Sequence, residues 1–245
     1  MSHVRSTNGC HNGNLLPASC GSCPVSGTTE WTCVNQAADD VLKAARRLAT
    51  YEVGETLFHQ QDAAQGVHCL MSGLVILKQL DAFGNETAFR ILFPGQTCGW
   101  RSLFAEQDHM ASAVALETSK VCFIPHADIE RLMDLDPRLS RRFLRTLAKD
   151  PGPADAVLLR SAFLPARVRL AHLLLMLTER CLGEDAEGEV CYRLPIKRKH
   201  IAALIGTTGE TVSRTIKELE DDALATFDQR NVLIPDIDRL RREVS

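Results

Sequence analysis

The sequence lacks an apolar run long enough to cross a bilayer. Its longest apolar stretch, residues 170–177, contains His172 and falls far short of the roughly 20 residues that a membrane span requires. The N-terminus also lacks the basic patch followed by an apolar segment that marks a secretory signal. We therefore expect a folded protein without membrane contact, located in the cytoplasm.

A strong overall charge is absent as well, since the formal net charge is only −3. This balance argues against binding of polyanions by the surface as a whole. One region departs from it, because the stretch from Arg193 to Lys217 contains six Lys or Arg residues and one acid, Glu210. A local basic surface is therefore predicted in the C-terminal part.

The nine cysteines are placed unevenly along the chain. A reducing cytoplasm disfavours a disulfide framework, which leaves metal ligation, thiol chemistry or simple burial. Four of them crowd the N-terminal segment, namely Cys10, Cys20, Cys23 and Cys33. The other five are scattered, and these are Cys69, Cys98, Cys122, Cys181 and Cys191.

With 245 residues, of which 45% are hydrophobic, the chain can form one large or two modest domains. Residues 1–35 are rich in Gly, Ser, Thr and Asn, so they need something else to order them. Residues 48–124 alternate short apolar stretches with glycines, which predicts a small antiparallel β-roll or barrel. The predicted strands cover residues 56–58, 67–71, 74–77, 88–93 and 121–124.

Helical spacing follows Pro125, and Asp136-Pro137 is expected to start a second helix. Its apolar stripe, which includes Leu139, Phe143, Leu144 and Leu147, suits packing against a partner helix and predicts a dimer seam. The sequence Pro151-Gly152-Pro153 interrupts this helix, because proline removes a backbone donor and clashes with the preceding turn.

Two short amphipathic helices, over residues 198–205 and 210–220, are predicted on either side of a turn at Gly206. Their apolar faces pack together, which leaves Glu210, Ser213, Arg214 and Lys217 on the outer face of the second helix. Arg can donate two hydrogen bonds to guanine, a carboxylate can accept one from cytosine, and a hydroxyl can serve several bases.

Contacts to DNA phosphates are expected from the basic stretch around Lys199 and from the helix N-terminus near Thr208. A hairpin over residues 225–234 follows the two helices. The plain alternative is a solvated helical hairpin in which Thr207 and Glu210 form a capping box.

The segment from Gly206 to Arg214, Gly-Thr-Thr-Gly-Glu-Thr-Val-Ser-Arg, closely resembles the recognition motif of the cAMP receptor protein/FNR family of transcription regulators. The resemblance extends over residues 48–240 and implies an α+β fold without enzymatic activity. Its parts would be a cysteine-rich segment (1–35), a cyclic-nucleotide-binding-like β-roll sensor (36–126), helices that include the dimerisation helix (127–165) and a winged helix-turn-helix DNA-binding domain (166–245).

Gly209 and Ser213 place the predicted reading helix closer to the FNR branch than to the cAMP-binding branch. This resemblance implies palindromic sites of the TTGAT type, read by Glu210, Ser213 and Arg214. Two half-sites about one helical turn apart require a homodimer. The resemblance also implies RNA polymerase as a partner.

Cyclic-nucleotide binders of the family hold phosphate with a Gly-Glu and an Arg-Ser/Thr-Ala segment, and neither is present. The corresponding stretches are Gly99-Trp100-Arg101-Ser102 and His109 to Ala113, with no Arg in the second. Arg101 could serve another anion, so an anionic ligand stays an alternative sensor signal.

Cys20-Gly-Ser-Cys23 is an alternative sensor motif, because four thiolates suit an iron–sulfur cluster or zinc. FNR-type oxygen sensors have an N-terminal CxxC, a third nearby cysteine and a fourth in a Val-Cys-x-Ile-Pro context. The resemblance therefore implies a [4Fe-4S] cluster on Cys20, Cys23, Cys33 and Cys122. Nine residues separate Cys23 from Cys33, a longer spacing than is usual in the family, so Cys10 stays an alternative to Cys33.

In that family an intact cluster favours the dimer, and oxygen degrades the cluster and releases DNA. The sequence does not separate oxygen from nitric oxide as the signal, and a zinc site, a thiol switch or haem stays possible. The break at Pro151-Gly152-Pro153 leaves the strength of the switch open. We expect Cys69, Cys98, Cys181 and Cys191 to pack as small hydrophobic side chains, and His68, His109 and His172 to be structural.

Overall fold

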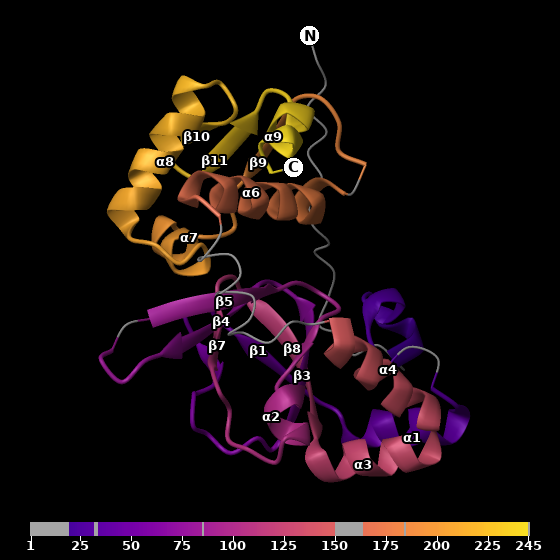
Figure 1. Cartoon of the computed structure of the whole chain (residues 1–245). Coiled ribbons are helices and arrows are strands. Elements are labelled where there is room, and N and C mark those ends of the chain that lie inside the picture. The colour runs from indigo at the N-terminus through magenta and orange to yellow at the C-terminus, as the bar shows by residue number, and fades with distance from the viewer. Residues whose placement is uncertain (1–19, 32–33, 85, 150–163, 184, 245) are drawn as a thin grey trace.

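The computed structural model describes residues 20–31, 34–84, 86–149, 164–183 and 185–244. They form a β-roll flanked by helices and a C-terminal unit that lies against one end of the roll (Figure 1). The predicted α+β class with a C-terminal winged helix-turn-helix is confirmed. The predicted break at Pro151-Gly152-Pro153 lies outside the described residues.

The roll consists of two four-stranded antiparallel sheets, with strand orders β1-β8-β3-β6 and β2-β7-β4-β5. Each of the five apolar stretches in the sequence overlaps a strand. The strands are β1 (Arg47–Tyr51), β2 (Thr56–Phe58), β3 (Gly66–Ser72), β4 (Val75–Leu80), β5 (Glu86–Leu92), β6 (Thr97–Cys98), β7 (Ser112–Ala115) and β8 (Ser119–Pro125). Their inward side chains, such as Leu70, Val75 and Val121, form a core within the roll.

Four of the helices in the described ranges belong to the roll: α1 (Gln36–Ala45), α2 (Trp100–Phe104), α3 (His126–Leu135) and α4 (Pro137–Lys149). The predicted helix start at Pro137 is confirmed, and Leu139 and Phe143 on its apolar stripe are buried. Leu144 on the same helix is 63% exposed, so part of the stripe is not covered by the described part of the chain. That exposure is what a dimer seam on α4 would require.

The C-terminal unit contains a long helix, a helix-turn-helix and a three-stranded sheet of order β10-β11-β9. Its elements are α6 (Ala166–Leu182), β9 (Val190–Arg193), α7 (Arg198–Leu204), α8 (Gly209–Asp221), β10 (Thr226–Asp228), β11 (Asn231–Ile234) and α9 (Ile237–Glu243). Gly206 turns the chain between α7 and α8 with a φ of 62°, a conformation that glycine adopts without strain.

The two units share a hydrophobic core. Leu74, Ile91 and Phe93 of the roll pack in one cluster with buried side chains of α6, α7 and α8. Helix α7 lies against β5, so the helix-turn-helix is seated directly on the roll (Figure 1). Among the described residues, no helix is both long and apolar enough to span a bilayer.

Candidate nucleic-acid interface and cysteine site

Helix α8 begins at a clear N-cap. The Thr208 hydroxyl accepts a hydrogen bond from the Thr211 amide at 3.2 Å, which satisfies one of the free N–H groups at the helix start. The alternative capping box between Thr207 and Glu210 is wrong by one residue, because Thr208 and not Thr207 caps the helix.

The two faces of α8 differ as the apolar spacing predicts. Val212, Ile216 and Leu219 are buried, and they share a core cluster with Ile201 and Ile205. The opposite face carries exposed polar side chains, namely Glu210, Ser213, Arg214 and Lys217. Such a row of donors and acceptors on a helix outer face is suitable for reading base edges in a major groove.

The side chains on this outer face are only lightly engaged within the chain. The Ser213 hydroxyl donates to the Gly209 carbonyl at 3.0 Å. The Arg214 guanidinium lies 3.9 Å from the Glu218 carboxylate, and its side chain is 71% exposed. An exposed ion pair of this length contributes little, so the guanidinium is available for an external partner.

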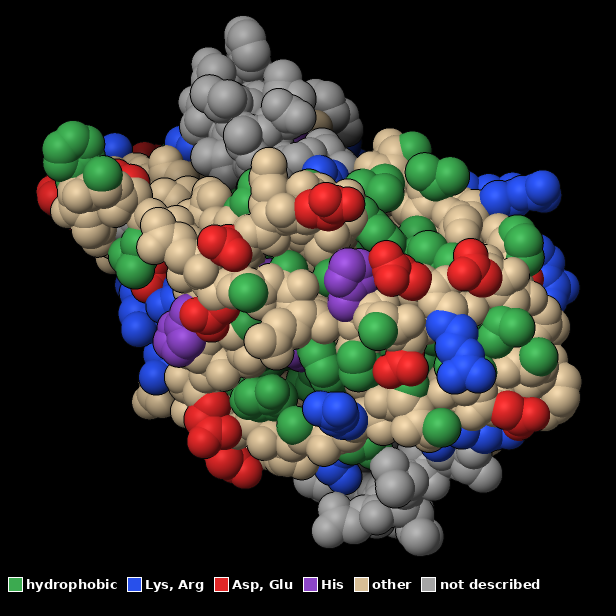
Figure 2. Space-filling view, turned by 90° about the horizontal axis from the view of Figure 1, so that it is seen from below, with side chains coloured by type: hydrophobic (Ala, Val, Ile, Leu, Met, Phe, Trp, Pro, Cys, Tyr) green, Lys and Arg blue, Asp and Glu red, His purple; other side chains and the backbone are tan. Residues whose placement is uncertain are grey.

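Lys199 and Thr208 are both exposed near the starts of α7 and α8. Lys199 is followed by His200, whose pKa is lowered by burial and by the Lys199 charge. The opposite side of the molecule has a different character. Figure 2 shows that the surface of the roll facing away from the C-terminal unit mixes acidic, basic and apolar side chains without a field of one sign.

Three of the predicted thiols are neighbours. Cys20 begins a short 3-10 turn (Cys20–Ser22), and Cys23 follows it directly. Both are half-buried, and Cys122 is buried on β8. Burial raises the pKa of the Cys122 thiol to about 12, and the nearby Cys20 thiol adds to this shift. Burial also raises the pKa of Cys20, whereas the Arg46 guanidinium opposes it. Cys33 and Cys10 lie outside the described residues.

The segment after Cys23 is anchored to the rest of the chain. Trp31 is 2% exposed and packs edge-on against Phe143 of α4, with 5.3 Å between ring centroids. The Glu30 carboxylate accepts hydrogen bonds from Thr97 at 2.8 Å and from Thr146 at 3.0 Å. The segment that was predicted to need something else to order it thus takes its partners, at Glu30 and Trp31, from the roll and α4.

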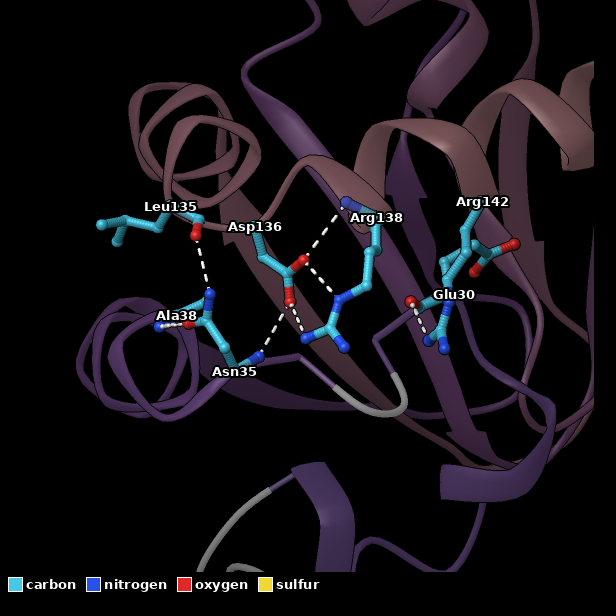
Figure 3. A network of polar contacts seen from close by, with 7 residues as sticks. All are labelled: Glu30, Asn35, Ala38, Leu135, Asp136, Arg138 and Arg142. Carbon is cyan, nitrogen blue, oxygen red and sulfur yellow. Dashed lines mark hydrogen bonds and ion pairs between the residues drawn. The ribbon is translucent and has the colours of Figure 1, made fainter.

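A polar network fixes the segment where it enters α1 (Figure 3). The Asp136 carboxylate accepts a hydrogen bond of 2.8 Å from the backbone N–H of Asn35. Each of its two oxygens also accepts a hydrogen bond of 2.8 Å from the Arg138 guanidinium. The Asn35 side chain donates to the Leu135 carbonyl at 2.7 Å, and its own oxygen caps α1. Arg138 hydrogen bonds hold the pKa of the Asp136 carboxyl well below its usual range.

The four cysteines expected to pack as small hydrophobic side chains divide into two pairs. Cys69 and Cys98 are buried in the roll, as expected. The prediction is wrong for Cys181 and Cys191, which are exposed, because α6 ends near Cys181 and Cys191 faces outward on β9. The predicted structural role of His68 and His109 agrees with their burial beside Phe58, whereas His172 is exposed.

The surroundings of the Cys20, Cys23 and Cys122 thiols are compatible with a bound group that presents sulfur. Cys20 and Trp31 pack in the same core cluster as Cys122, and the Trp31 indole N–H is buried without a hydrogen-bond partner among the described residues. An unpaired buried donor is costly, and sulfur near it would serve as acceptor. The described Cys, His, Asp and Glu side chains form no group of three able to hold a single metal ion.

The stretches that correspond to a cyclic-nucleotide site have a different chemistry. Trp100 is 2% exposed, and its indole N–H donates to the Thr97 carbonyl at 3.0 Å. Met110 occupies the second stretch without a cationic group. The first stretch therefore lacks the carboxylate expected of a cyclic-nucleotide site, and the second stretch lacks the arginine.

Comparison with known families gives two matches. Residues 48–136 match the family described as "Cyclic nucleotide-binding domain". Residues 168–243 match the "Crp-like helix-turn-helix domain". The two matches cover the roll with α3 and almost all of the C-terminal unit.

Individual proteins with similar sequences are transcription regulators. The chain is 29% identical to the transcriptional activator protein FnrA of Stutzerimonas stutzeri, over 89% of each chain. It is 32% identical to the cyclic AMP receptor protein of Thermus thermophilus, over 73% of this chain and 78% of that protein. Among solved structures, FixK2 from Bradyrhizobium japonicum aligns with a TM-score of 0.71 and 22% identity, over 82% of this chain and 98% of that one.

Proposed function

Because the chain belongs to the cAMP receptor protein/FNR family of DNA-binding transcription regulators, we propose that it senses oxygen through a [4Fe-4S] cluster and binds TTGAT-type palindromes as a homodimer. The cluster ligands are Cys20, Cys23, Cys33 and Cys122. The relatives named FnrA and Anr support this assignment. The missing Gly-Glu and Arg-Ser/Thr-Ala segments argue against a nucleotide sensor, although another relative is named cyclic AMP receptor protein.

The observation that carries the proposal is the proximity of Cys20 and Cys23 to Cys122. These residues come from opposite ends of the roll sequence, yet their thiols are close enough to influence each other's pKa. The cluster, when bound, supplies an oxygen-labile inorganic core that needs four thiolates. The chain supplies an apolar setting for it, with Trp31 and the buried face of β8.

A continuous path leads from this site to the proposed dimer seam. Cys122 lies on β8, which runs directly into α3, and Asp136 joins α3 to α4. On the other side, Glu30 and Trp31 hold α4 through Thr146 and Phe143. Ordering of the N-terminal segment therefore bears on α4 from two directions, which couples the thiols to a helix with an exposed apolar residue, Leu144.

On DNA, each outer-face residue of α8 has a separate role. Arg214 donates to guanine, Glu210 accepts from cytosine and Ser213 contacts a further base edge. Lys199 and the α8 N-terminus at Thr208 bind phosphates. The proposed cellular location is the cytoplasm. The proposed protein partner at promoters is RNA polymerase.

The test uses full-length protein purified without oxygen. The expected result is the broad visible absorption of an iron–sulfur protein, about four iron and four sulfide per chain, and gel-shift binding to a TTGAT palindrome that is lost in air. Cys122→Ala removes the iron, whereas the matched variant Cys98→Ala, which also empties a buried thiol position in the roll, retains it.

Two outcomes overturn the sensor assignment while leaving DNA binding intact. Colourless anaerobic protein with one zinc per chain indicates a zinc site. Normal oxygen sensing by Cys122→Ala indicates a thiol switch elsewhere. Failure to bind any TTGAT palindrome, with or without oxygen, overturns the proposed reading by Glu210, Ser213 and Arg214.

A further inference from the structure

We infer that Arg167 is a positioning residue for DNA reading, because it ties the C-terminal end of the reading helix α8 to α6 and α9. Arg167 lies in the first turn of α6. Asp222 is the C-cap of α8, and Glu243 is the last residue of α9. This role rests on the proposed reading of bases by α8 and does not involve the cysteines or a bound cluster.

The Arg167 guanidinium binds two carboxylates that belong to different helices. Its Nε donates a hydrogen bond of 2.6 Å to one oxygen of Glu243, and a terminal nitrogen lies 3.4 Å from the other oxygen. The second terminal nitrogen donates to the Asp222 carboxylate. A planar guanidinium that is held at all three nitrogens has a fixed direction as well as a fixed position, which a lysine ammonium would not give.

This cluster is better shielded than the ion pair on the outer face of α8. The side chains of Arg167 and Glu243 are each 25% exposed, and Asp222 is the more exposed partner at 54%. In the outer-face pair, by contrast, Arg214 is 71% exposed. Hydrogen bonding to Glu243 is the main cause that raises the pKa of the Arg167 guanidinium, and Asp222 adds to the shift. Partly buried pairs are screened less by salt, so the cluster should persist at the ionic strength at which DNA is bound.

The end of α8 takes its positive charge from outside the helix. The last turn of α8 contains no basic residue, and the residues around it are acidic, namely Glu218, Glu220, Asp221 and Asp222. Acids at this position oppose the helix dipole, whose negative end lies at the C-terminus. Arg167 supplies a cation to the Asp222 side chain, and Arg239 of α9 donates to the Asp222 carbonyl at 3.2 Å. The two arginines therefore stabilise a helix end that its own sequence leaves unfavourable.

Helix α6 holds the helix-turn-helix at its other end as well. The Arg169 guanidinium donates to the carbonyl of Gly206, the turn residue before α8, at 3.3 Å. Between these two contacts α8 packs on α6 through its apolar face, on which Val212 and Leu219 are buried. The apolar face keeps α8 on α6, and the arginine contacts limit how far it can tilt.

Small tilts of α8 matter for base reading. Arg214 precedes Asp222 by eight residues, and at a rise of about 1.5 Å per residue this is about 12 Å along the helix axis. A tilt of about 10° at the end that Arg167 holds therefore displaces the backbone of Arg214 by about 2 Å. Hydrogen bonds tolerate a range of about 0.5 Å, so base-specific bonds are lost first. Contacts to phosphates depend on charge over longer distances and persist.

The experiment measures DNA binding by the full chain, purified without oxygen, with fluorescence anisotropy. The three DNAs are a TTGAT palindrome, the same palindrome with one substituted base pair per half-site, and unrelated DNA. Arg167→Met, which removes the charge and keeps an extended side chain, should lower the preference for the matched over the substituted palindrome about tenfold, the loss of one two-pronged base contact. Affinity for unrelated DNA should change less than about twofold, with an unchanged salt slope. Arg167→Lys, which restores the charge, should recover part of the preference.

Arg241→Met is the matched control, because the ion pair of Arg241 with Asp238, at 2.7 Å, lies within α9. This variant should keep the preference of the parent. Asp222→Asn is an independent change at the exposed side of the cluster and should lower the preference as well. The double variant Arg167→Met/Asp222→Asn should be no less selective than Arg167→Met, since both changes remove the same contact.

Circular dichroism melts establish that each variant is folded. A folded Arg167→Met chain with the selectivity of the parent overturns the positioning role, whether or not its melting temperature falls. An equal loss on all three DNAs, with a salt slope reduced by about one, also overturns it, since that pattern marks a direct phosphate contact. Failure of the parent to prefer TTGAT overturns the proposed target sequence instead. The variants are then compared on the palindrome that the parent selects from random-sequence DNA, so the two failures stay separate.

Discussion

Cys69 and Cys122 lie directly opposite each other on the antiparallel strands β3 and β8, and both side chains are buried in one core cluster. Opposed residues in an antiparallel pair have Cα atoms about 4.5–5.5 Å apart, within the range of about 4.4–6.8 Å that a disulfide spans. We expect diamide, which takes two electrons and two protons from a thiol pair, to link these cysteines in the metal-free chain. Peptide mass analysis without reduction measures the link.

Two variants control this prediction. Cys69→Ala should leave Cys122 unlinked, and Cys98→Ala should change nothing, because the register partner of Cys98 is His68 and not a thiol. A chain whose Cys69 and Cys122 both stay reduced while Cys20 and Cys23 pair would contradict the prediction.

Replacement of Asp136 by Asn should destabilise the chain at neutral pH by about 2 kcal/mol, the range of a lost charge-assisted hydrogen bond. The folded pKa of Asp136 is depressed, so the unfolded state binds more protons once the pH falls below about 4. The stability from this carboxylate is therefore present at neutral pH and lost on acidification. Urea unfolding at several pH values should show the variant and the parent converging at low pH.

Asp134 provides the matched control, since it is an exposed acid near the end of α3. Asp134→Asn should lower the unfolding midpoint far less. If both variants behaved alike, the network of Figure 3 would contribute nothing beyond general charge.

His68 should make the roll sensitive to mild acid. Burial is the main cause that lowers its pKa to about 4, so the unfolded state binds more protons between pH 6.5 and 4. Stability is then highest above pH 6.5 and declines toward pH 4, by about 3 kcal/mol at about 1.4 kcal/mol per pKa unit. His68→Phe, which keeps a ring between Phe58 and Phe123, should remove most of this decline in thermal melts.

The exposed His59 supplies the comparison, because His59→Gln should retain the acid-dependent decline of the parent. A His68→Phe chain with an unchanged pH profile would show that other groups determine the acid response.

Two changes in the DNA-binding unit should separate base reading from phosphate binding. Arg214→Ala is expected to cost about 1–3 kcal/mol and to relax preference at one base pair. Lys199→Ala should weaken all sequences alike and reduce the salt slope by about one. Gel shifts with matched and substituted palindromes at several salt concentrations measure both effects. Lys120→Ala on β8 of the roll is the control, and an Arg214→Ala chain with full sequence preference would contradict the proposed reading.

The helix-turn-helix was predictable because its signals are local. Apolar residues at helical spacing around Ile201 and Val212, with Gly206 between them, fix α7 and α8 to within about one residue. The N-cap was placed one residue early because Thr207 and Thr208 are chemically equivalent, and only backbone geometry distinguishes them.

Sequence reasoning missed β1, β6, β7 and β9, and two of these carry especially weak patterns. Strand β1 is largely exposed and β6 has two residues, so neither shows an apolar alternation. Both are held by pairing with distant strands, β8 and β3 respectively. Such pairing is a tertiary property that no short window of sequence contains.

The candidate site was predictable in part. The CxxC motif and Cys122 could be proposed from family resemblance, but the anchoring by Glu30 and Trp31 could not. Asn35 and Asp136 are 101 residues apart in sequence, and neither residue type signals the other.

The anchored Trp31 has a consequence for how fast the protein could recover after oxidative damage. Since the indole and Glu30 already hold the segment after Cys23 beside α4, little of the chain would have to be rearranged for the proposed cluster to form again. Repair of existing molecules would then compete with synthesis of new ones. For the proposed oxygen sensor, this anchoring favours reloading of the existing molecule over its replacement.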